Sequence, residues 1–291
     1  MKFGCATATR AAFKISASFI AGIVLLALSG QAHAGAVLEQ SSSATGTTSA
    51  APAWSTKAVT AGHLLIAVVQ WQTTTASNGV VTAPAGWALA AASSHNFGTS
   101  SANIVNANIY YYENGPARAK SATETFSVSS STGIVVQIAE VSGIVISGSL
   151  DVAGTQNAAG ATSITVSSSS ATSTGPELAI GAFGTDGSKN NQELSGASAP
   201  FFDLGSGDVS GPATDELGTY SPSISAGTIV TETISSNNKP SNMVAAIATF
   251  KVSTATYYWA GAGGYAKRPP SPPAAKCYGY FDDGGCWSTT S

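Results

Sequence analysis

Charged residues are scarce in this sequence. Asp, Glu, Lys and Arg make up 9% of its 291 residues, whereas 43% are hydrophobic. Ser, Thr, Ala, Gly and Asn take the place that Lys, Glu and Arg occupy in a cytosolic enzyme. Such a composition suits extended strands and turns more than helices. The scarcity of charge therefore favours an extracellular module.

An apolar run near the start of the sequence covers residues 15–28 and is shorter than the roughly 20 residues that a membrane-spanning helix needs. Three basic residues precede the run, and polar residues end it at 29–31. Ala32 and Ala34 supply the small-x-small pattern of a cleavage site. We predict a signal peptide over residues 1–34, and a secreted or cell-surface protein with no membrane span after cleavage.

The net charge of the mature chain bears on its partners. Cleavage after residue 34 removes three of the 12 basic residues and none of the 15 acidic residues, so the net charge becomes about −6. A surface of this sign has no electrostatic footprint for nucleic acid or anionic lipid. We therefore expect no nucleic-acid partner.

Cysteine is rare as well. Cys5 would leave with the signal peptide, so Cys277 and Cys286 remain as an even pair. In an exported protein such a pair predicts a disulfide. Closing a loop of about ten residues would stabilise the folded form by roughly 2 to 3 kcal/mol. Zinc binding by the same residues would need two further ligands.

Long helical patterns are absent, and strand-like segments take their place. Residues 62–71 form a nearly uninterrupted apolar run behind a glycine, and residues 175–183 and 242–250 echo it. Similar segments recur every ten to twenty residues or so, separated by Gly, Asn, Ser and Pro. This spacing predicts an all-β fold, a single antiparallel sandwich over residues 35–254.

The first apolar run carries apolar residues on both alternating faces, so both faces need a cover. One cover would be the opposing sheet. The other candidates are the loops at residues 186–222 and the aromatic C-terminal tail. Residues 186–222 are rich in Gly, Ser, Asn and acids, and we expect a long excursion with one short strand there.

The C-terminal part differs in composition from the rest of the chain. Residues 255–275 are rich in Gly and Pro and predict a semi-rigid linker. Residues 276–291 would form a small tail looped by the disulfide. The tail carries aromatic side chains at Tyr278, Tyr280, Phe281 and Trp287. These residues would stack on sugar rings, pack on a partner protein, or fold back onto the sandwich.

Several short motifs resemble, in their order, those of a known module. They lie at residues 62–66, 83–87, 110–112, 140–144 and 150–152. In this order they are similar to a jelly-roll-like β-sandwich module of bacterial surface proteins and of phage tail or fibre proteins. The resemblance covers residues 37–252, with a histidine at position 63 where that module more often has an acid. It implies a structural or adhesive role and carries no catalytic residues across.

Glu140 is the best candidate for acid–base chemistry. It interrupts an apolar strand, where burial would raise the pKa of a carboxyl group. A glycosidase needs a second carboxyl about 5 to 10 Å away, and no spacing singles one out. The non-catalytic alternatives place Glu140 on the solvent face, or make it a partner for Lys or for backbone donors.

Other catalytic and metal motifs are weaker. No Gly-x-Ser-x-Gly elbow frames a serine, so we expect His63 at a strand start and His95 in a loop. Asp203 with Asp208, and Asp282 with Asp283, could serve as calcium ligands, because these acids lie on glycine-rich turns. Turns also recruit Asp and Gly for backbone reasons alone. We predict no cofactor.

The sequence as a whole favours a non-enzymatic module for adhesion, surface or fibre structure, or glycan recognition. Trp87 is expected to fill the core. The possible partners are a glycan or a surface protein, and the oligomeric state stays open. The alternative function is a carbohydrate-active hydrolase on the same scaffold.

Overall fold

The computed structural model describes residues 35–73, 79–96, 104–185, 194–209, 214–236, 241–253, 258–259 and 287–288. Residues 34–254 belong to one compact unit, and residues 1–33 and 255–291 to a second. In the second unit the described residues are a pair of antiparallel strands, β17 (Tyr258–Trp259) and β18 (Trp287–Ser288). Within the described segments, no helix is long and apolar enough to cross a membrane.

The first half of the larger unit contains eight strands. They are β1 (Val37–Gly46), β2 (Ser49–Ala50), β3 (Leu64–Thr73), β4 (Val81–Thr82), β5 (Ala88–Asn96), β6 (Ile104–Tyr112), β7 (Phe126–Val128) and β8 (Gly133–Ser142). The second half contains eight more. They are β9 (Leu150–Ala161), β10 (Ser163–Ser167), β11 (Glu177–Thr185), β12 (Leu194–Ser195), β13 (Phe202–Val209), β14 (Thr214–Ile224), β15 (Thr231–Ser236) and β16 (Ser241–Lys251).

The strands of the larger unit form four antiparallel sheets, so the predicted all-β antiparallel fold is confirmed. The first half builds a five-stranded sheet in the order β1-β8-β3-β6-β5 and a three-stranded sheet in the order β2-β7-β4. The second half builds a five-stranded sheet in the order β9-β16-β11-β14-β13 and a three-stranded sheet in the order β10-β15-β12. The two halves therefore share one topology, in which each strand of the first half matches the strand eight places later.

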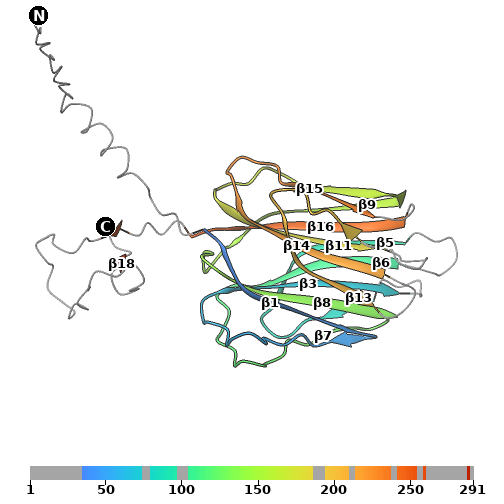
Figure 1. Ribbon diagram of the computed structural model, residues 1–291, viewed down its shortest axis with the longest axis horizontal. Helices are drawn as coiled ribbons and strands as arrows, with labels where there is room; N and C mark the ends of the chain where they lie inside the picture. The colour runs from blue at the N-terminus through green and yellow to red at the C-terminus, as the bar shows by residue number, and fades with distance from the viewer. Residues whose placement is uncertain are drawn as a thin grey trace, which may run out of the picture. The chain divides into compact units, whose positions relative to one another are not determined.

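The four sheets are stacked in layers, with the two five-stranded sheets in the middle (Figure 1). Buried residues form three clusters. One fills the space between the two five-stranded sheets, and the other two lie beneath the three-stranded sheets. β7 lies towards one end of the stack and β15 towards the other (Figure 1). The structure thus contains two pairs of sheets, whereas the sequence predicted a single pair that forms one sandwich.

The contacts between the two inner sheets follow an approximate two-fold relation. β1 of the first half lies beside β13 of the second, and β9 lies beside β5. Exchanging the halves converts the first contact into the second. The central strands β3 and β11 also contact each other, as expected for elements close to such an axis.

β3 is buried along its whole length, as its apolar sequence requires. Leu64, Ile66 and Val68 face the second five-stranded sheet, and Leu65, Ala67 and Val69 face the sheet β2-β7-β4. The prediction of a cover on both faces is confirmed. Its second cover is the five-stranded sheet of the other half, to which residues 186–222, one of the two expected covers, contribute β13 and most of β14.

The segment expected to be a long excursion is mostly strand. Within residues 186–222 the structure describes β12, β13 and most of β14, which pair with β15, with β14 and with β11 respectively. The prediction of a single short strand there is therefore wrong. Glycines made these strands hard to see, but Gly205 and Gly218 have a packing role, since they face the buried side chain of Gln137.

Two glutamine side chains lie in the interface between the inner sheets. Gln70 of β3 is fully buried and donates hydrogen bonds from Nε2 to the carbonyl oxygens of Phe183, at 3.1 Å, and Leu217, at 3.2 Å. Gln137 of β8 is 1% exposed, and neither of its amide atoms has a hydrogen-bond partner among the described residues. The fit of Gln137 against Gly218 is close, because a Cβ atom at Gly218 would lie 2.0 Å from Gln137 Oε1.

Gly218→Ala is expected to destabilise the protein by roughly 1 to 3 kcal/mol, because the added methyl group overpacks the interface. Gly205→Ala is the matched control, since its Cβ would stand 3.7 Å from Gln137 at ordinary contact distance. Urea unfolding of both variants measures the difference. Combining Gly218→Ala with Gln137→Ala should recover part of the loss, and equal stabilities of the two glycine variants would contradict the packing argument.

Candidate functional site

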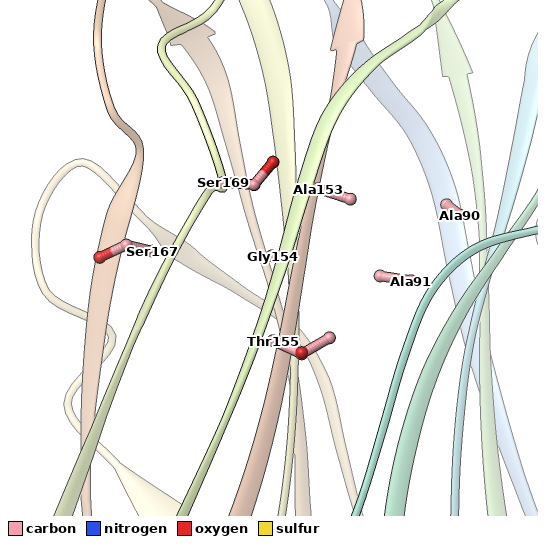
Figure 2. Close-up of a pocket in the computed structure, with 7 residues that line it drawn as sticks. All are labelled: Ala90, Ala91, Ala153, Gly154, Thr155, Ser167 and Ser169. Carbon is pink, nitrogen blue, oxygen red and sulfur yellow. The ribbon is translucent and has the colours of Figure 1, made fainter.

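A groove of about 470 Å³ lies where the edge strands β5 and β9 of the two inner sheets come together. Its lining residues are Ala90, Ala91, Ala153, Gly154, Thr155, Ser167 and Ser169. Figure 2 shows the two β5 alanines on one side of β9 and the two serines on the other. All seven residues are small, and none carries a charge.

The floor of the groove depends on close backbone approach. A Cβ atom at Gly154 would lie 1.9 Å from the carbonyl oxygen of Ser167, so only glycine fits there. The Ser169 N–H donates to the Ala153 carbonyl at 2.9 Å, and Ser93 Oγ donates to the Gln156 carbonyl at 3.0 Å. These bonds hold the segment that follows β10, and β5, against β9. Hydroxyl groups and small apolar surfaces can bind a neutral polar ligand, but they supply no general acid or base.

Glu140, the catalytic candidate from the sequence, fixes the segment that leads into β3. It is fully buried, and its Oε1 accepts hydrogen bonds from the Thr60 N–H at 2.8 Å and pairs with His63 Nδ1 at 2.6 Å. Its Oε2 accepts from Gln40 Nε2 at 2.7 Å. The solvent-facing alternative is wrong, and the role as a partner for backbone donors is confirmed. His63 directly precedes β3, as predicted.

A second buried carboxylate, Glu124, joins three side chains that the sequence analysis did not connect. It accepts from Arg118 Nε at 2.7 Å, from Trp54 Nε1 at 3.4 Å and from Trp87 Nε1 at 3.2 Å. The Trp87 ring packs edge-on against Phe126, with ring centroids 5.4 Å apart. The prediction that Trp87 fills the core is confirmed, and its indole N–H has a specific partner as well.

Among the described residues, Glu232 on β15 has the carboxyl group whose pKa is raised most. It is fully buried, Thr219 Oγ1 donates to its Oε2 at 2.8 Å, and its Oε1 has no partner among the described residues. Gly181 makes room for it, since a Cβ there would lie 2.3 Å from Oε2. Burial raises the pKa of Glu232 to about 8, and the nearby charge of Asp203 adds to the effect.

The alternation of β15 could have revealed Glu232 from the sequence. Val230, Glu232 and Ile234 lie at every second position, and all three are buried. A period of two therefore places the carboxyl group on the apolar face. By contrast, the groove residues carry no signal in the sequence, because Ala, Gly, Ser and Thr are common throughout this chain.

The remaining predicted site residues have different outcomes. His95 lies on β5, so the prediction of a loop position is wrong. Asp203 is exposed on β13, and the side chain of Asp208 is not described. Within the described ranges, no group of three or more His, Cys, Asp or Glu side chains is arranged to hold a metal ion.

The predicted residues of the tail lie outside the described part of the chain. They are Cys277, Tyr278, Tyr280, Phe281, Asp282, Asp283 and Cys286. For Trp287 the structure gives the backbone pairing with Trp259 alone. The disulfide and the aromatic contact element therefore stay predictions.

Comparisons of this chain with protein-family models, with curated proteins and with solved structures find no match.

Trp87→Ala should lower the free energy of unfolding by about 3 to 5 kcal/mol, because it leaves a cavity and removes a donor from Glu124. Trp87→Phe retains most of the ring packing and removes the same donor. Its smaller loss of unfolding free energy distinguishes the contribution of the hydrogen bond from that of the cavity. Urea unfolding measures both, and an unchanged midpoint for Trp87→Ala would refute the core role.

Glu232 should make the protein less stable as pH rises. The unfolded chain releases this proton near the ordinary value of 4.5, whereas the folded protein keeps it up to about pH 8. The free energy of unfolding therefore falls between these two pH values and levels off above pH 8, by roughly 3 to 5 kcal/mol in all.

Glu232→Gln should flatten this part of the stability profile, measured by urea unfolding from pH 4 to pH 9. The amide can still accept from Thr219 but does not titrate. Glu39→Gln is the control. Hydrogen bonds from Lys57 and Ser142 lower the pKa of Glu39, so its replacement should leave the slope between about pH 5 and pH 8 intact. A wild-type profile without that slope would contradict the assignment.

Proposed function

We propose that this chain is a secreted or cell-surface module without catalytic activity, which works in adhesion, in surface or fibre structure, or in glycan recognition. The observation that carries the proposal is that the buried acidic side chains and the residues of the groove are separate sets. Glu124, Glu140, Glu177 and Glu232 are buried with internal partners, whereas the groove between β5 and β9 is uncharged. Neutral glycans, which present hydroxyl groups, suit such a lining.

The topology supports the resemblance to jelly-roll modules of bacterial surface proteins and phage tail or fibre proteins. A jelly roll contains eight strands in two sheets. Each half of this chain has eight strands in two sheets, with neighbours β1-β8-β3-β6 and β2-β7-β4 in the first half. We propose that the chain contains two such sandwiches packed through their larger sheets.

The C-terminal tail belongs to the same proposal. A disulfide between Cys277 and Cys286 would present Tyr278, Tyr280 and Phe281 on a small loop, with Trp287 next to it. Aromatic side chains on a segment too small to bury them commonly make contacts with ligands or partners. The tail would add a second contact element to the groove.

A carbohydrate-active hydrolase is the alternative. It requires two carboxyl groups about 5 to 10 Å apart on either side of a bound sugar. None of the seven groove residues is acidic. Glu140 accepts three hydrogen bonds in the protein interior, which gives the hydrolase less support than the binding module.

The mature protein should bind a subset of neutral glycans on an array. Thr155→Trp would fill the groove from an exposed position and should weaken this binding at least tenfold, or about 1.4 kcal/mol. Ser163→Trp is the control, since Ser163 is exposed outside the groove lining. Deleting residues 269–291 tests the tail separately.

The outcomes distinguish the two elements and the two functions. Binding lost with Thr155→Trp alone assigns recognition to the groove, and binding lost with the deletion alone assigns it to the tail. If the intact protein binds neither glycans nor cell surfaces and instead releases sugars from polysaccharides, the hydrolase replaces the proposal.

A further inference from the structure

Three neighbouring strands bring an amine and two carboxyl groups together at one end of the second five-stranded sheet. β16 lies between β9 and β11, and its Lys251 is directly opposite Glu177 of β11. Lys251 Nζ stands 3.4 Å from Oδ1 of Asp151 on β9. The three residues therefore come from three adjacent strands.

The carboxyl groups of this cluster are shielded from solvent. Glu177 is fully buried, and 7% of the Asp151 side chain is exposed, whereas Lys251 retains 30% exposure. Phe250, which precedes Lys251, is fully buried and pairs with Leu150. The amine thus lies at the edge of the apolar interior, with part of its side chain still exposed to solvent.

Hydrogen bonds hold the Asp151 carboxyl in one orientation. The Ser173 N–H donates to Oδ2 at 2.6 Å, and Ser173 Oγ donates to Oδ1. Two such donors would also stabilise negative charge on these oxygens during an attack on Cγ, in the manner of an oxyanion hole. Lys251 Nζ further donates to the Gly148 carbonyl at 3.3 Å, which keeps the amine next to Asp151.

Glu177 is suited to transferring protons. Its Oε1 accepts from the Thr174 N–H and Oγ1, while its Oε2 has no hydrogen bond of normal geometry among the described residues. Burial, together with the adjacent Asp151 carboxylate, raises the pKa of Glu177. Burial acts on Asp151 in the same direction, but Ser173 and Lys251 lower the pKa of Asp151 overall. Neighbouring groups whose pKa values are pushed apart in this way can exchange protons as acid and base.

We propose that Lys251 and Asp151 form an intramolecular amide bond, with Glu177 as the proton-transferring group. The Lys251 Nζ–Asp151 Cγ bond forms, and one Cγ–Oδ bond breaks. Two protons pass from the ammonium group to the departing oxygen, by way of the Glu177 carboxyl, which ends in its starting state. The oxygen leaves as water, the amide nitrogen keeps one hydrogen, and no oxidant or reductant is required.

The first half of the protein provides an internal comparison. The register of the strands places Glu39, Ser142 and His63 at the positions of Asp151, Lys251 and Glu177. A serine replaces the lysine there, so the same bond cannot form. Glu39 instead pairs with Lys57 at 2.6 Å, with 23% and 44% of the two side chains exposed. An exposed pair of this kind is expected to remain an ion pair.

Mass spectrometry of the secreted chain tests the bond directly. After reduction and denaturation, the intact mass should be lower than the sequence mass by one water molecule. Trypsin should fail to cleave after Lys251 and should release a branched peptide that contains Lys251 and Asp151. Trypsin should still cleave after Lys57, and the peptide of residues 35–57, which contains both Glu39 and Lys57, should have its full sequence mass.

Variants separate the bond from the ion pair. Lys251→Arg keeps the positive charge and should restore the full sequence mass, and Lys57→Arg should leave the mass deficit unchanged. Glu177→Gln should reduce the cross-linked fraction to a small part of the wild-type value. A wild-type chain with the full mass and no branched peptide would overturn the proposal, and complete cross-linking in Glu177→Gln would overturn the role of Glu177.

Discussion

The packing of the two five-stranded sheets on each other is the interaction on which the rest of this structure depends. It buries the inner faces of β3 and β11, and the three-stranded sheets bury their outer faces, which accounts for the nearly continuous apolar sequences of these two strands. Because the inner faces cover each other, each outer face needs a further cover. The short sheets β2-β7-β4 and β10-β15-β12 provide it. The four-layer arrangement thus follows from one interface and two outward apolar faces.

The buried polar groups show how the remaining positions are fixed. A carboxylate in an apolar interior is costly unless donors surround it. Glu140 and Glu124 have such donors: Glu140 joins a loop to β8, and Glu124 joins three loop segments of the first half. Glu232 keeps a proton instead, and Gly181 provides the space for it. These side chains serve the scaffold. Under the proposed function, recognition at the groove between β5 and β9 would rest on shape and on hydroxyl groups.

Periodicity and turn residues were sufficient to predict the all-β class, the position of β3 and the burial of Trp87. They were insufficient to predict the repeated topology, because the two halves share a strand order and not a sequence pattern. At matched positions Leu64 corresponds to Leu178, but His63 corresponds to Glu177. The groove was also beyond prediction, since its residues belong to strands from different halves. Such contacts depend on the inner interface, which no local pattern encodes.

The approximate two-fold relation between the halves has a consequence for self-association. In an exact dimer, a residue near the axis meets its own copy, so both sides must be equally large. Here Gln70 of β3 corresponds to Gly184 of β11, and Gln137 of β8 corresponds to Ala246 of β16. One half contributes the long amides and the other the space for them. Two copies of the first half would place glutamine side chains against each other, and two copies of the second half would leave unfilled space at the same positions. The fit therefore favours the pairing of a first half with a second half over the pairing of two like halves.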